Sequence, residues 1–472
     1  MPPTIATVNP ATGATLAEYP AMTAAQIDSA VATATAAQST WATVGFEGRS
    51  DVLRTAAAVL RTREEQLSRL VTREMGKPLT ESRAEIHKCA TGLEFYAVHA
   101  ASLLADEDYP TPADRSWVSY EPLGLVLAIM PWNFPLWQVF RFAAPALMAG
   151  NAALLKHSPN TTGSALACQD IFTDAGLPDG LFTTLVITEA EVPTAVEQLI
   201  ADPRVGAVTI TGSERAGRAV GALAGREIKK SVLELGGSDP FVVLADAEVE
   251  AVARLAVRGR FLNAGQSCIS PKRFIVETPV AEEFTRLVVE QTAALRVGDP
   301  EAPGTDVGPL ARLDLRDDVA AQVAAAVAEG AAVLTGGHVR DDLPGFYYQP
   351  TVLAGVQPTM AIHSEEVFGP VATILVVDDV DEAVAVANDT PFGLGASVWS
   401  RNVDAAIDVG RRITSGACFI NALTASDTRM PFGGTKRSGY GRELAAPGIR
   451  EFVNIRTWWA LDSPPRVAPR SE

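Results

Sequence analysis

The chain has 472 residues, of which 47% are hydrophobic and 20% are charged, so it is long enough for several domains with apolar cores. Its 39 Lys and Arg against 56 Asp and Glu give a net charge of −17, which argues against a nucleic-acid partner. Four scattered cysteines and five histidines form no disulfide framework or metal-ligand cluster, and no signal peptide or membrane span is indicated. We therefore expect a cytoplasmic protein that binds no metal.

Helical patterns dominate the first hundred residues. Apolar periodicity predicts helices from Thr23 to about Trp41, over about 49–75 and over about 80–104. Thr23 and Gln26 have the spacing of a capping box, in which two side chains satisfy free backbone N–H groups at a helix start.

From about residue 124, short β-rich runs alternate with helical segments, which predicts mostly parallel sheets covered by helices. The expected strands are 124–130, 152–156, 182–187 and 205–211 in a first sheet, and 241–244, 273–276, 332–335, 373–377, 396–399 and 418–420 in a second. Two α/β sheets imply two domains. The crevice between them is a natural ligand site, because ligands bind beyond the carboxyl ends of parallel strands.

Cys268 is the candidate nucleophile among the four cysteines. It follows Asn263-Ala-Gly-Gln-Ser267, where small and polar residues allow a tight, partly exposed loop. A reactive thiol needs such exposure and nearby hydrogen-bond donors. The alternative is a buried packing cysteine, which we expect for Cys89, Cys168 and Cys418.

Two further segments carry polar groups suited to chemistry at a carbonyl carbon. Glu234 lies in an apolar run before Gly236 and Gly237, and burial would raise its pKa towards that of a general base near neutral pH. The alternative is a strand-end glutamate that points to solvent. Asn133 lies in the rigid segment Pro131-Trp-Asn-Phe-Pro135, where its amide could donate to a developing oxyanion. The alternative is a proline-stiffened loop without a chemical role.

The segment Thr209-Ile-Thr-Gly-Ser-Glu-Arg-Ala-Gly217 predicts a strand, a turn and the start of a helix. Free N–H groups at a helix start can bind phosphate. The segment matches neither the GxGxxG pattern nor a P-loop, so by itself it identifies no class of nucleotide-binding protein, and a P-loop phosphotransferase is disfavoured.

Together these segments resemble the aldehyde dehydrogenase superfamily, and the resemblance covers nearly the whole chain. It begins at Asn9-Pro-Ala-Thr-Gly13 and includes the PWNFP, ELGG and GQSC segments around Asn133, Glu234 and Cys268. It continues through Glu365-Glu-Val-Phe-Gly-Pro370 to the PFGGTKRSG segment near the C-terminus.

The resemblance implies a role for each of these residues. Cys268 would attack the aldehyde carbon, Asn133 would hold the oxyanion, and Glu234 would activate the water that hydrolyses a thioester. The family's cofactor-contacting positions fall on Trp132, Lys156, Gly212, Ser213, Leu235, Glu366 and Phe368.

The choice of cofactor depends on the segment Lys156-His-Ser-Pro159. NAD-preferring relatives carry a glutamate where Pro159 stands, and that carboxylate binds the ribose hydroxyls. Without it nothing repels a 2′-phosphate, Lys156 offers charge, and Ser158 or His157 could donate a hydrogen bond. We therefore expect NADP, with NAD tolerated. For His157 the alternative is a partly exposed spacer.

The choice of substrate depends on Arg141, which follows Trp137 by four residues and therefore shares a helix face with it. Bacterial succinate-semialdehyde dehydrogenases resemble this sequence in placing an arginine there, where it would pair with the substrate's distal carboxylate. The alternative is an arginine that extends to solvent. Leu262 stands where some relatives have a second arginine, so Ser426 is expected to supply a hydroxyl instead.

The resemblance thus implies NAD(P)⁺-dependent oxidation of succinic semialdehyde to succinate through a cysteine hemithioacetal and a thioester. The alternatives are a dehydrogenase for another short aldehyde, such as glutaric semialdehyde, and a cysteine esterase or thioesterase.

The resemblance also implies an α/β fold with a Rossmann-like cofactor domain, a catalytic domain and a small β bridging element. The expected boundaries are 1–105 and 125–235 for the NAD(P)-binding domain, 236–435 for the catalytic domain, and 106–124 and 436–472 for the bridging element and tail. The bridging element would add a strand to a neighbour's sheet, which implies a homodimer or homotetramer.

Overall fold

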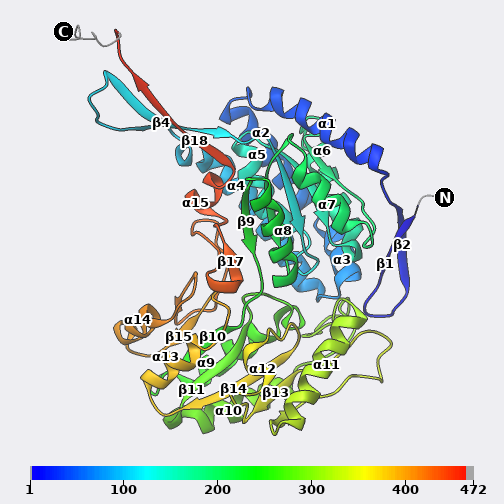
Figure 1. Cartoon of the computed structure of the whole chain (residues 1–472). Coiled ribbons are helices and arrows are strands. Elements are labelled where there is room, and N and C mark those ends of the chain that lie inside the picture. Colours follow the sequence, from blue (N-terminus) through cyan, green and yellow to red (C-terminus); the bar gives the residue numbers. More distant parts are fainter. Residues whose placement is uncertain (1–2, 464–472) are drawn as a thin grey trace.

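The computed structural model describes residues 3–463 and shows two α/β units, one above the other in Figure 1, with a two-stranded arm that projects from the upper unit. The predicted C-terminal tail lies outside the described residues beyond Ser463. An N-terminal hairpin lies at the side of the molecule and consists of β1 (Thr4–Val8) and β2 (Thr15–Pro20).

The N-terminal region is helical, as predicted, with one difference. Its helices are α1 (Ala24–Trp41), α2 (Phe46–Thr62), α3 (Glu64–Met75) and α4 (Leu79–Leu103). Thr23 and Gln26 form the predicted capping box. The single helix predicted over 49–75 is two helices, because the backbone leaves helical geometry at Arg63 (φ −98°, ψ 13°), whose side chain pairs with Asp174.

The first sheet has six strands in the order β17-β9-β8-β5-β6-β7, of which β17 alone is antiparallel. The strands are β5 (Leu125–Met130), β6 (Ala152–His157), β7 (Phe182–Thr184), β8 (Val205–Thr211), β9 (Lys230–Glu234) and β17 (Gly439–Tyr440). Four helices follow its strands: α5 (Trp137–Met148), α6 (Thr162–Asp174), α7 (Val192–Ala201) and α8 (Glu214–Arg226). The chain runs outward from β5 to β7 and then returns to β8, so a topological switch point lies between β5 and β8.

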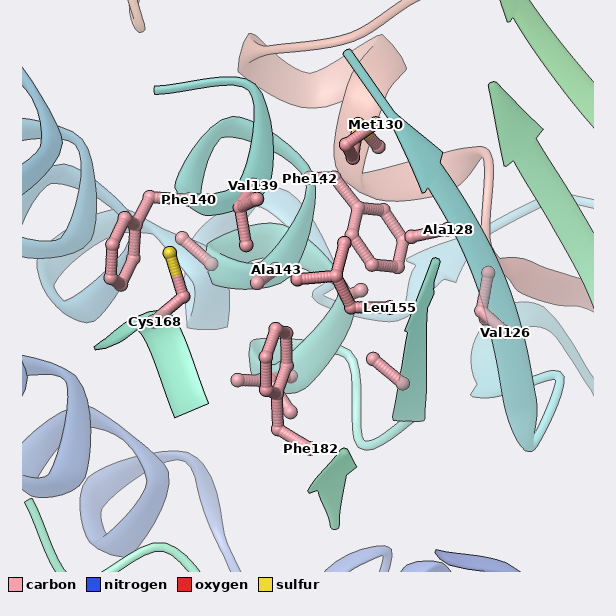
Figure 2. Close-up of a cluster of buried hydrophobic side chains, with 14 of the residues drawn as sticks. Val126, Ala128, Met130, Val139, Phe140, Phe142, Ala143, Leu155, Cys168 and Phe182 are labelled. Carbon is pink, nitrogen blue, oxygen red and sulfur yellow. The ribbon is translucent and has the colours of Figure 1, made fainter. Parts of the chain in front are cut away.

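The core of this unit lies between the first sheet and helices α5 and α6. Figure 2 shows Ala128 of β5 and Leu155 of β6 near Phe142 of α5, with Cys168 of α6 beside Phe140 of the same helix. Every residue of α5 is buried. A helix that is buried on all sides is normally apolar all round, so its one arginine, Arg141, requires a partner.

The second sheet has seven strands in the order β12-β13-β14-β11-β10-β15-β16, with β12 antiparallel at one edge. The strands are β10 (Asp239–Val243), β11 (Pro271–Glu277), β12 (Ala332–Thr335), β13 (Thr351–Ala354), β14 (Val371–Val377), β15 (Ser397–Trp399) and β16 (Phe419–Ile420). Its helices are α9 (Val249–Phe261), α10 (Thr278–Ala293), α11 (Leu313–Ala328), α12 (Ala361–Ser364), α13 (Val380–Asn388) and α14 (Val403–Arg412).

Both faces of the second sheet are covered. Phe241 and Val243 belong to the hydrophobic cluster on one face, and Val242 belongs to the cluster on the other, as expected for alternating side chains of a strand. Of its strands, β13 was not predicted from the sequence, since its four residues give too short a pattern. The predicted α/β fold class with two parallel-type sheets is confirmed.

The projecting arm in Figure 1 is made by β4 (Arg115–Pro122) and β18 (Val453–Ala460), with β3 (Glu107–Asp108) beside β4. The strands are antiparallel, and Trp117 stacks on Trp458 with ring centroids 5.3 Å apart. The short helix α15 (Ala445–Arg450) leads into β18. Residues 439–440, which were expected in the bridging element, pair instead with β9 of the first sheet. The domain boundaries otherwise stay a prediction.

Between residues 3 and 463 no helix is long and apolar enough to cross a membrane. The same residues contain no group of three or more His, Cys, Asp or Glu side chains placed to hold a metal ion.

Candidate active site

The predicted site residues of the first unit lie just beyond the carboxyl ends of its parallel strands. Trp132 follows β5, Lys156 lies at the end of β6, Gly212 follows β8, and Glu234 ends β9. The switch point between β5 and β8 therefore lies at the centre of the predicted site. This is the position at which open α/β sheets bind ligands.

The loop that carries Cys268 has an unusual backbone. After α9 the chain forms a 3-10 turn over Leu262–Gly265, in which Asn263 and Ala264 have φ near +54° and +53°. Such left-handed residues cost of order 1–3 kcal/mol each and persist only where surrounding contacts hold them. One such contact comes from α4, where the Glu81 carboxylate accepts a hydrogen bond from the Asn263 backbone N–H at 2.8 Å.

Arg260 ties this loop to the segment 366–370. Its buried guanidinium donates to the carbonyls of Gly265, Val367, Gly369 and Val371 and to the Ser270 hydroxyl, at 2.5–3.3 Å. Burial lowers the pKa of Arg260 to about 9, and Glu366 acts in the opposite direction. The planar guanidinium can bind five acceptors at once, so it fixes the cysteine loop against the predicted cofactor-contacting segment.

Cys268 is a free, half-buried thiol. Its backbone carbonyl accepts a hydrogen bond from Lys272 at 2.9 Å, and a Cβ atom on Gly237 would lie 2.8 Å from that carbonyl oxygen. The second glycine of the ELGG segment therefore lets the cysteine loop approach β9. Burial raises the pKa of the thiol to about 12, against the charges of Arg141 and Lys272. The thiol is protonated at neutral pH in this arrangement and needs a proton acceptor to become a nucleophile.

Asn133 lies beside the same loop. Its side-chain amide donates to the Gln266 carbonyl at 3.1 Å, and its backbone carbonyl accepts from the Asn263 side chain at 2.8 Å. Asn133, the predicted oxyanion donor, is thus buried. Its contacts with Asn263 and Gln266 hold it against the turn that precedes Cys268.

Glu234 is 2% exposed, and neither of its carboxyl oxygens has a hydrogen-bond partner among the described residues. Burial raises its pKa well above the ordinary value, and the nearby carboxyl of Glu443 raises it further. Arg141 acts in the opposite direction. A buried carboxyl without a partner is costly, and it is the kind of group that takes up a proton near neutral pH.

The residues predicted to contact the nicotinamide bridge the two units. The Glu366 carboxylate accepts from the Gly237 backbone N–H at 3.0 Å and lies 3.5 Å from the Lys272 ammonium. The Phe368 ring meets the edge of Trp132, with ring centroids 5.7 Å apart. Trp132 belongs to the first unit and Phe368 to the second, so this contact lies where the units meet.

The residues predicted to contact a 2′-phosphate lie at the end of β6 and just after it. Lys156 is 8% exposed, and its ammonium has no hydrogen-bond or ion-pair partner within residues 3–463; burial lowers its pKa to about 8, and Glu189 acts in the opposite direction. Pro159 follows with no carboxylate. An ammonium without a partner, with no carboxylate at position 159 to repel a phosphate, fits the 2′-phosphate of NADP.

Neither of the other two predicted donors has a free proton. His157 is buried, with Nε2 3.0 Å from the Pro135 carbonyl and Nδ1 3.0 Å from the Thr161 hydroxyl, and burial lowers its pKa to about 4. It is not an exposed spacer, because its buried ring connects two loops. Its predicted contact with the cofactor stays a prediction. The Ser158 hydroxyl donates to the Asn160 side-chain oxygen at 2.6 Å, which leaves the Asn160 amide nitrogen without a partner among the described residues. Asn160 is a donor that sequence reasoning missed.

The remaining cofactor candidates shape the start of α8. Ser213 caps that helix by accepting from the Ala216 N–H at 3.3 Å, and the Gly212 N–H donates to the Glu234 carbonyl at 2.9 Å. Leu235 packs against Gly217, where a Cβ atom would lie 2.4 Å from the leucine methyls. These contacts bring the helix start, with its free N–H groups, to the carboxyl edge of the sheet.

Arg141, the predicted partner of the substrate carboxylate, has partners inside the fold. It is buried and pairs with Glu443, donates to the Thr211 hydroxyl at 3.1 Å, and lies 4.9 Å from the Phe432 ring centroid. It does not extend to solvent, and its pairing with a substrate carboxylate stays a prediction. Sequence reasoning missed Glu443, which is distant in the chain.

Trp137 and Ser426 do lie together, and Lys88 of α4 joins them. The Ser426 hydroxyl accepts from the Lys88 ammonium at 2.6 Å and from the Trp137 indole N–H at 3.2 Å. Lys88 was not predicted. Its spacing from Glu81 and Glu85, seven and three residues along the helix, is a signal that could have placed all three on one face.

The sequence profile described as the aldehyde dehydrogenase family matches residues 2–458. The chain belongs to the aldehyde dehydrogenase family. The membership predicted from the motifs is therefore confirmed.

Several members of the family are similar over their whole length. The chain is 49% identical to succinate-semialdehyde dehydrogenase [NADP(+)] 1 of Mycobacterium tuberculosis over 462 residues, covering 96% of this chain and 99% of that protein. It is also 49% identical, over 455 residues and with the same coverage, to the probable succinate-semialdehyde dehydrogenase [NADP(+)] of a Synechocystis strain.

Solved structures of the family show the same fold. Succinic semialdehyde dehydrogenase from Streptococcus pyogenes, in complex with NADP⁺, superposes with a TM-score of 0.94 at 35% identity, covering 97% of this chain and 100% of that one. An NAD-dependent aldehyde dehydrogenase from Sinorhizobium meliloti gives a TM-score of 0.95 at 35% identity, covering 98% of this chain and 93% of that one. The fold is thus shared by members described with either cofactor, so the cofactor choice depends on particular residues.

Proposed function

We propose that this chain oxidises succinic semialdehyde to succinate with NADP⁺ as the oxidant. The observation that carries the proposal is that the Asn133 amide contacts the Cys268 loop, while Arg141 is close enough to Glu234 and to Cys268 to lower the pKa of both. The full-length similarity to proteins named as NADP(+)-dependent succinate-semialdehyde dehydrogenases supports the choice of substrate and cofactor.

The residues act in sequence on the aldehyde carbon. The Cys268 thiol passes its proton to water as its sulfur bonds to that carbon, and the amide of Asn133 with the Cys268 backbone N–H holds the oxygen of the resulting hemithioacetal. A bound NADP⁺ would supply the acceptor for the hydride of this carbon, and the cysteine would then carry a thioester. Glu234 then takes a proton from the water that attacks the thioester, and succinate and the free thiol are released.

The cofactor preference rests on three features at the end of β6 and just after it. Lys156 offers an unpaired ammonium, Asn160 offers an amide N–H, and Pro159 places no carboxylate where one would repel a 2′-phosphate. Together these features predict a higher kcat/KM with NADP than with NAD, with NAD still accepted.

A comparison of two aldehydes with two cofactors tests the proposal. Succinic semialdehyde and butanal, which has the same chain length and no charge, are each assayed with NADP and NAD by absorbance of the reduced nicotinamide. We expect the highest kcat/KM for succinic semialdehyde with NADP, and a smaller NADP preference for Pro159→Glu. Equal kcat/KM for both aldehydes would contradict the proposed substrate. A preference of the wild type for NAD would contradict the proposed cofactor.

The proposed role of Glu234 makes a separate prediction. Glu234→Gln removes the base used for thioester hydrolysis, so we expect one equivalent of reduced cofactor per active site in a rapid burst, followed by turnover slowed by about 10²–10⁴. The exposed Glu197→Gln serves as the control and should turn over normally. Loss of the burst itself would contradict a role confined to hydrolysis.

We further propose that the arm formed by β4 and β18 joins copies of this chain into a homodimer or homotetramer. The support is an exposed edge strand: Asn454 to Thr457 of β18 are exposed, and Trp459 is 55% exposed. An unpaired edge invites pairing with another strand. Light scattering that shows a monomer at micromolar concentration would contradict this. The cytoplasmic location stays a prediction, in keeping with a mechanism that needs a reduced Cys268.

A further inference from the structure

We propose that Lys272 is a positioning residue that directs the Cys268 backbone N–H toward the oxygen of the substrate. This inference rests on the proposed function and deepens it, because it names the group that orients one of the two donors to the oxyanion. It follows from three observations. The Lys272 ammonium binds the Ser267 carbonyl, its N–H groups are all used inside the fold, and the Cys268 N–H has no acceptor among residues 3–463.

Lys272 lies beneath the loop that carries the nucleophile. It is the second residue of β11, which lies between β10 and β14 in the second sheet, and its side chain is 3% exposed. Its ammonium donates to the carbonyl oxygens of Ser267, Cys268 and Ser270 at 3.1, 2.9 and 3.3 Å. Three carbonyls of one short turn therefore point to a single buried cation.

The Lys272 ammonium has no N–H group left for substrate or cofactor. An ammonium carries three N–H groups, and the three carbonyls accept all of them. The Glu366 carboxylate, 3.5 Å away, supplies a counter-charge. Burial lowers the pKa of Lys272, and the charge of Glu366 opposes that effect. Lys272 can therefore act on the reaction only through the loop that it holds and through its charge.

The hydrogen bond to Ser267 sets the direction of the Cys268 N–H. The Ser267 carbonyl and the Cys268 N–H belong to one peptide unit, which is planar and trans, so the two groups point in opposite directions. The Ser267 oxygen accepts from Lys272 and also from the Ser270 backbone N–H, at 3.1 Å in each case. Because its oxygen is directed to the buried ammonium, this peptide unit directs its N–H to the opposite side of the loop.

The Cys268 N–H is available to a ligand on that side. It donates to no acceptor within residues 3–463, whereas most buried backbone N–H groups are paired. A carbonyl that accepts from a cation also polarises its peptide unit, which makes the N–H a stronger donor. Lys272 thus both orients this N–H and strengthens it for a developing negative charge on oxygen.

The charge of Lys272 also favours the thiolate of Cys268. Burial raises the pKa of this thiol to about 12, the charges of Arg141 and Lys272 lower it, and those of Glu366 and Asp239 raise it. These four charged groups face the thiol from α5, from β11, from the segment before β14 and from β10. Removing the Lys272 charge would therefore raise the thiol pKa and reduce the thiolate fraction at a given pH.

A merely structural role for Lys272 predicts the opposite change in thiol reactivity. If Lys272 only stabilised the loop, its removal would loosen the loop, and iodoacetamide would alkylate Cys268 faster. If Lys272 orients the N–H and favours the thiolate, alkylation slows down. Aldehyde oxidation then slows more than alkylation, because the reaction with iodoacetamide forms no oxyanion.

The Lys272→Met variant tests the proposal. We expect kcat for succinic semialdehyde and for butanal to fall about 10- to 100-fold, less than the loss of about 10²–10³ for a missing oxyanion donor, because the hydrogen bond from Ser270 remains. Alkylation of Cys268 at fixed pH, followed by mass spectrometry of its peptide, should slow by about 3- to 10-fold. KM for the aldehydes should stay within about threefold, since the orientation acts on the transition state.

Two further variants and one structure complete the test. Lys272→Arg keeps the charge and the donors and should recover part of kcat, and the exposed Lys230→Met is the matched control that should change neither rate. If Lys272→Met does not fold, a crystal structure of wild type with butanal decides. We expect the aldehyde oxygen to accept from the Cys268 N–H while the Ser267 oxygen stays on Lys272. A Ser267 oxygen turned toward the aldehyde would overturn the proposal.

The outcomes separate this inference from the proposed function. If Lys272→Met keeps kcat within about threefold of wild type, or if its Cys268 is alkylated faster, the Lys272 assignment is wrong and the proposed function stands. A Lys272→Arg variant slower than Lys272→Met would also overturn the assignment. If wild type oxidises neither aldehyde with either cofactor, the proposed function is wrong, and the Cys268 N–H has no oxyanion to bind.

Discussion

A buried ion pair between Lys77 and Glu85 fixes the start of α5, and the candidate active site depends on that position. One oxygen of Glu85 lies 2.5 Å from the Lys77 ammonium, and the other accepts the N–H groups of Leu136 and Trp137 at 2.8 and 2.9 Å. A carboxylate at a helix start satisfies free N–H groups and complements the helix dipole. Lys77 also lies 3.9 Å from the Phe134 ring centroid, so the segment that directly follows Asn133 is held in place.

The same face of α4 serves three parts of the site. Glu81 holds the left-handed turn before Cys268, Glu85 holds the start of α5, and Lys88 lies against Trp137. These residues lie at four- and three-residue intervals, which places them in line along one helix. Among residues 3–463, the Glu234 carboxyl has no hydrogen-bond partner, and the Lys156 ammonium has no hydrogen-bond or ion-pair partner. These two groups lie at the positions at which reaction and cofactor binding are proposed.

Much of the fold was predictable because its signals are local. The capping box at Thr23, the strand at 205–211 and the alternation of strands and helices all depend on neighbouring residues. Motif residues such as Asn133 and Cys268 were predicted to meet from family resemblance, and their loops do lie in contact. The pairing of Arg141 with Glu443 could not be predicted, since it joins distant segments through tertiary packing. The helix break at Arg63 was missed because the apolar periodicity continues across it.

The proposed chemistry requires that the aldehyde carbon reach Cys268 while the Asn133 amide binds its oxygen. A crystal structure of the Cys268→Ala variant with NADP⁺ and succinic semialdehyde tests this most directly. We expect the aldehyde oxygen within hydrogen-bond distance of the Asn133 amide, with the aldehyde carbon next to residue 268. An aldehyde group bound away from both residues would contradict this.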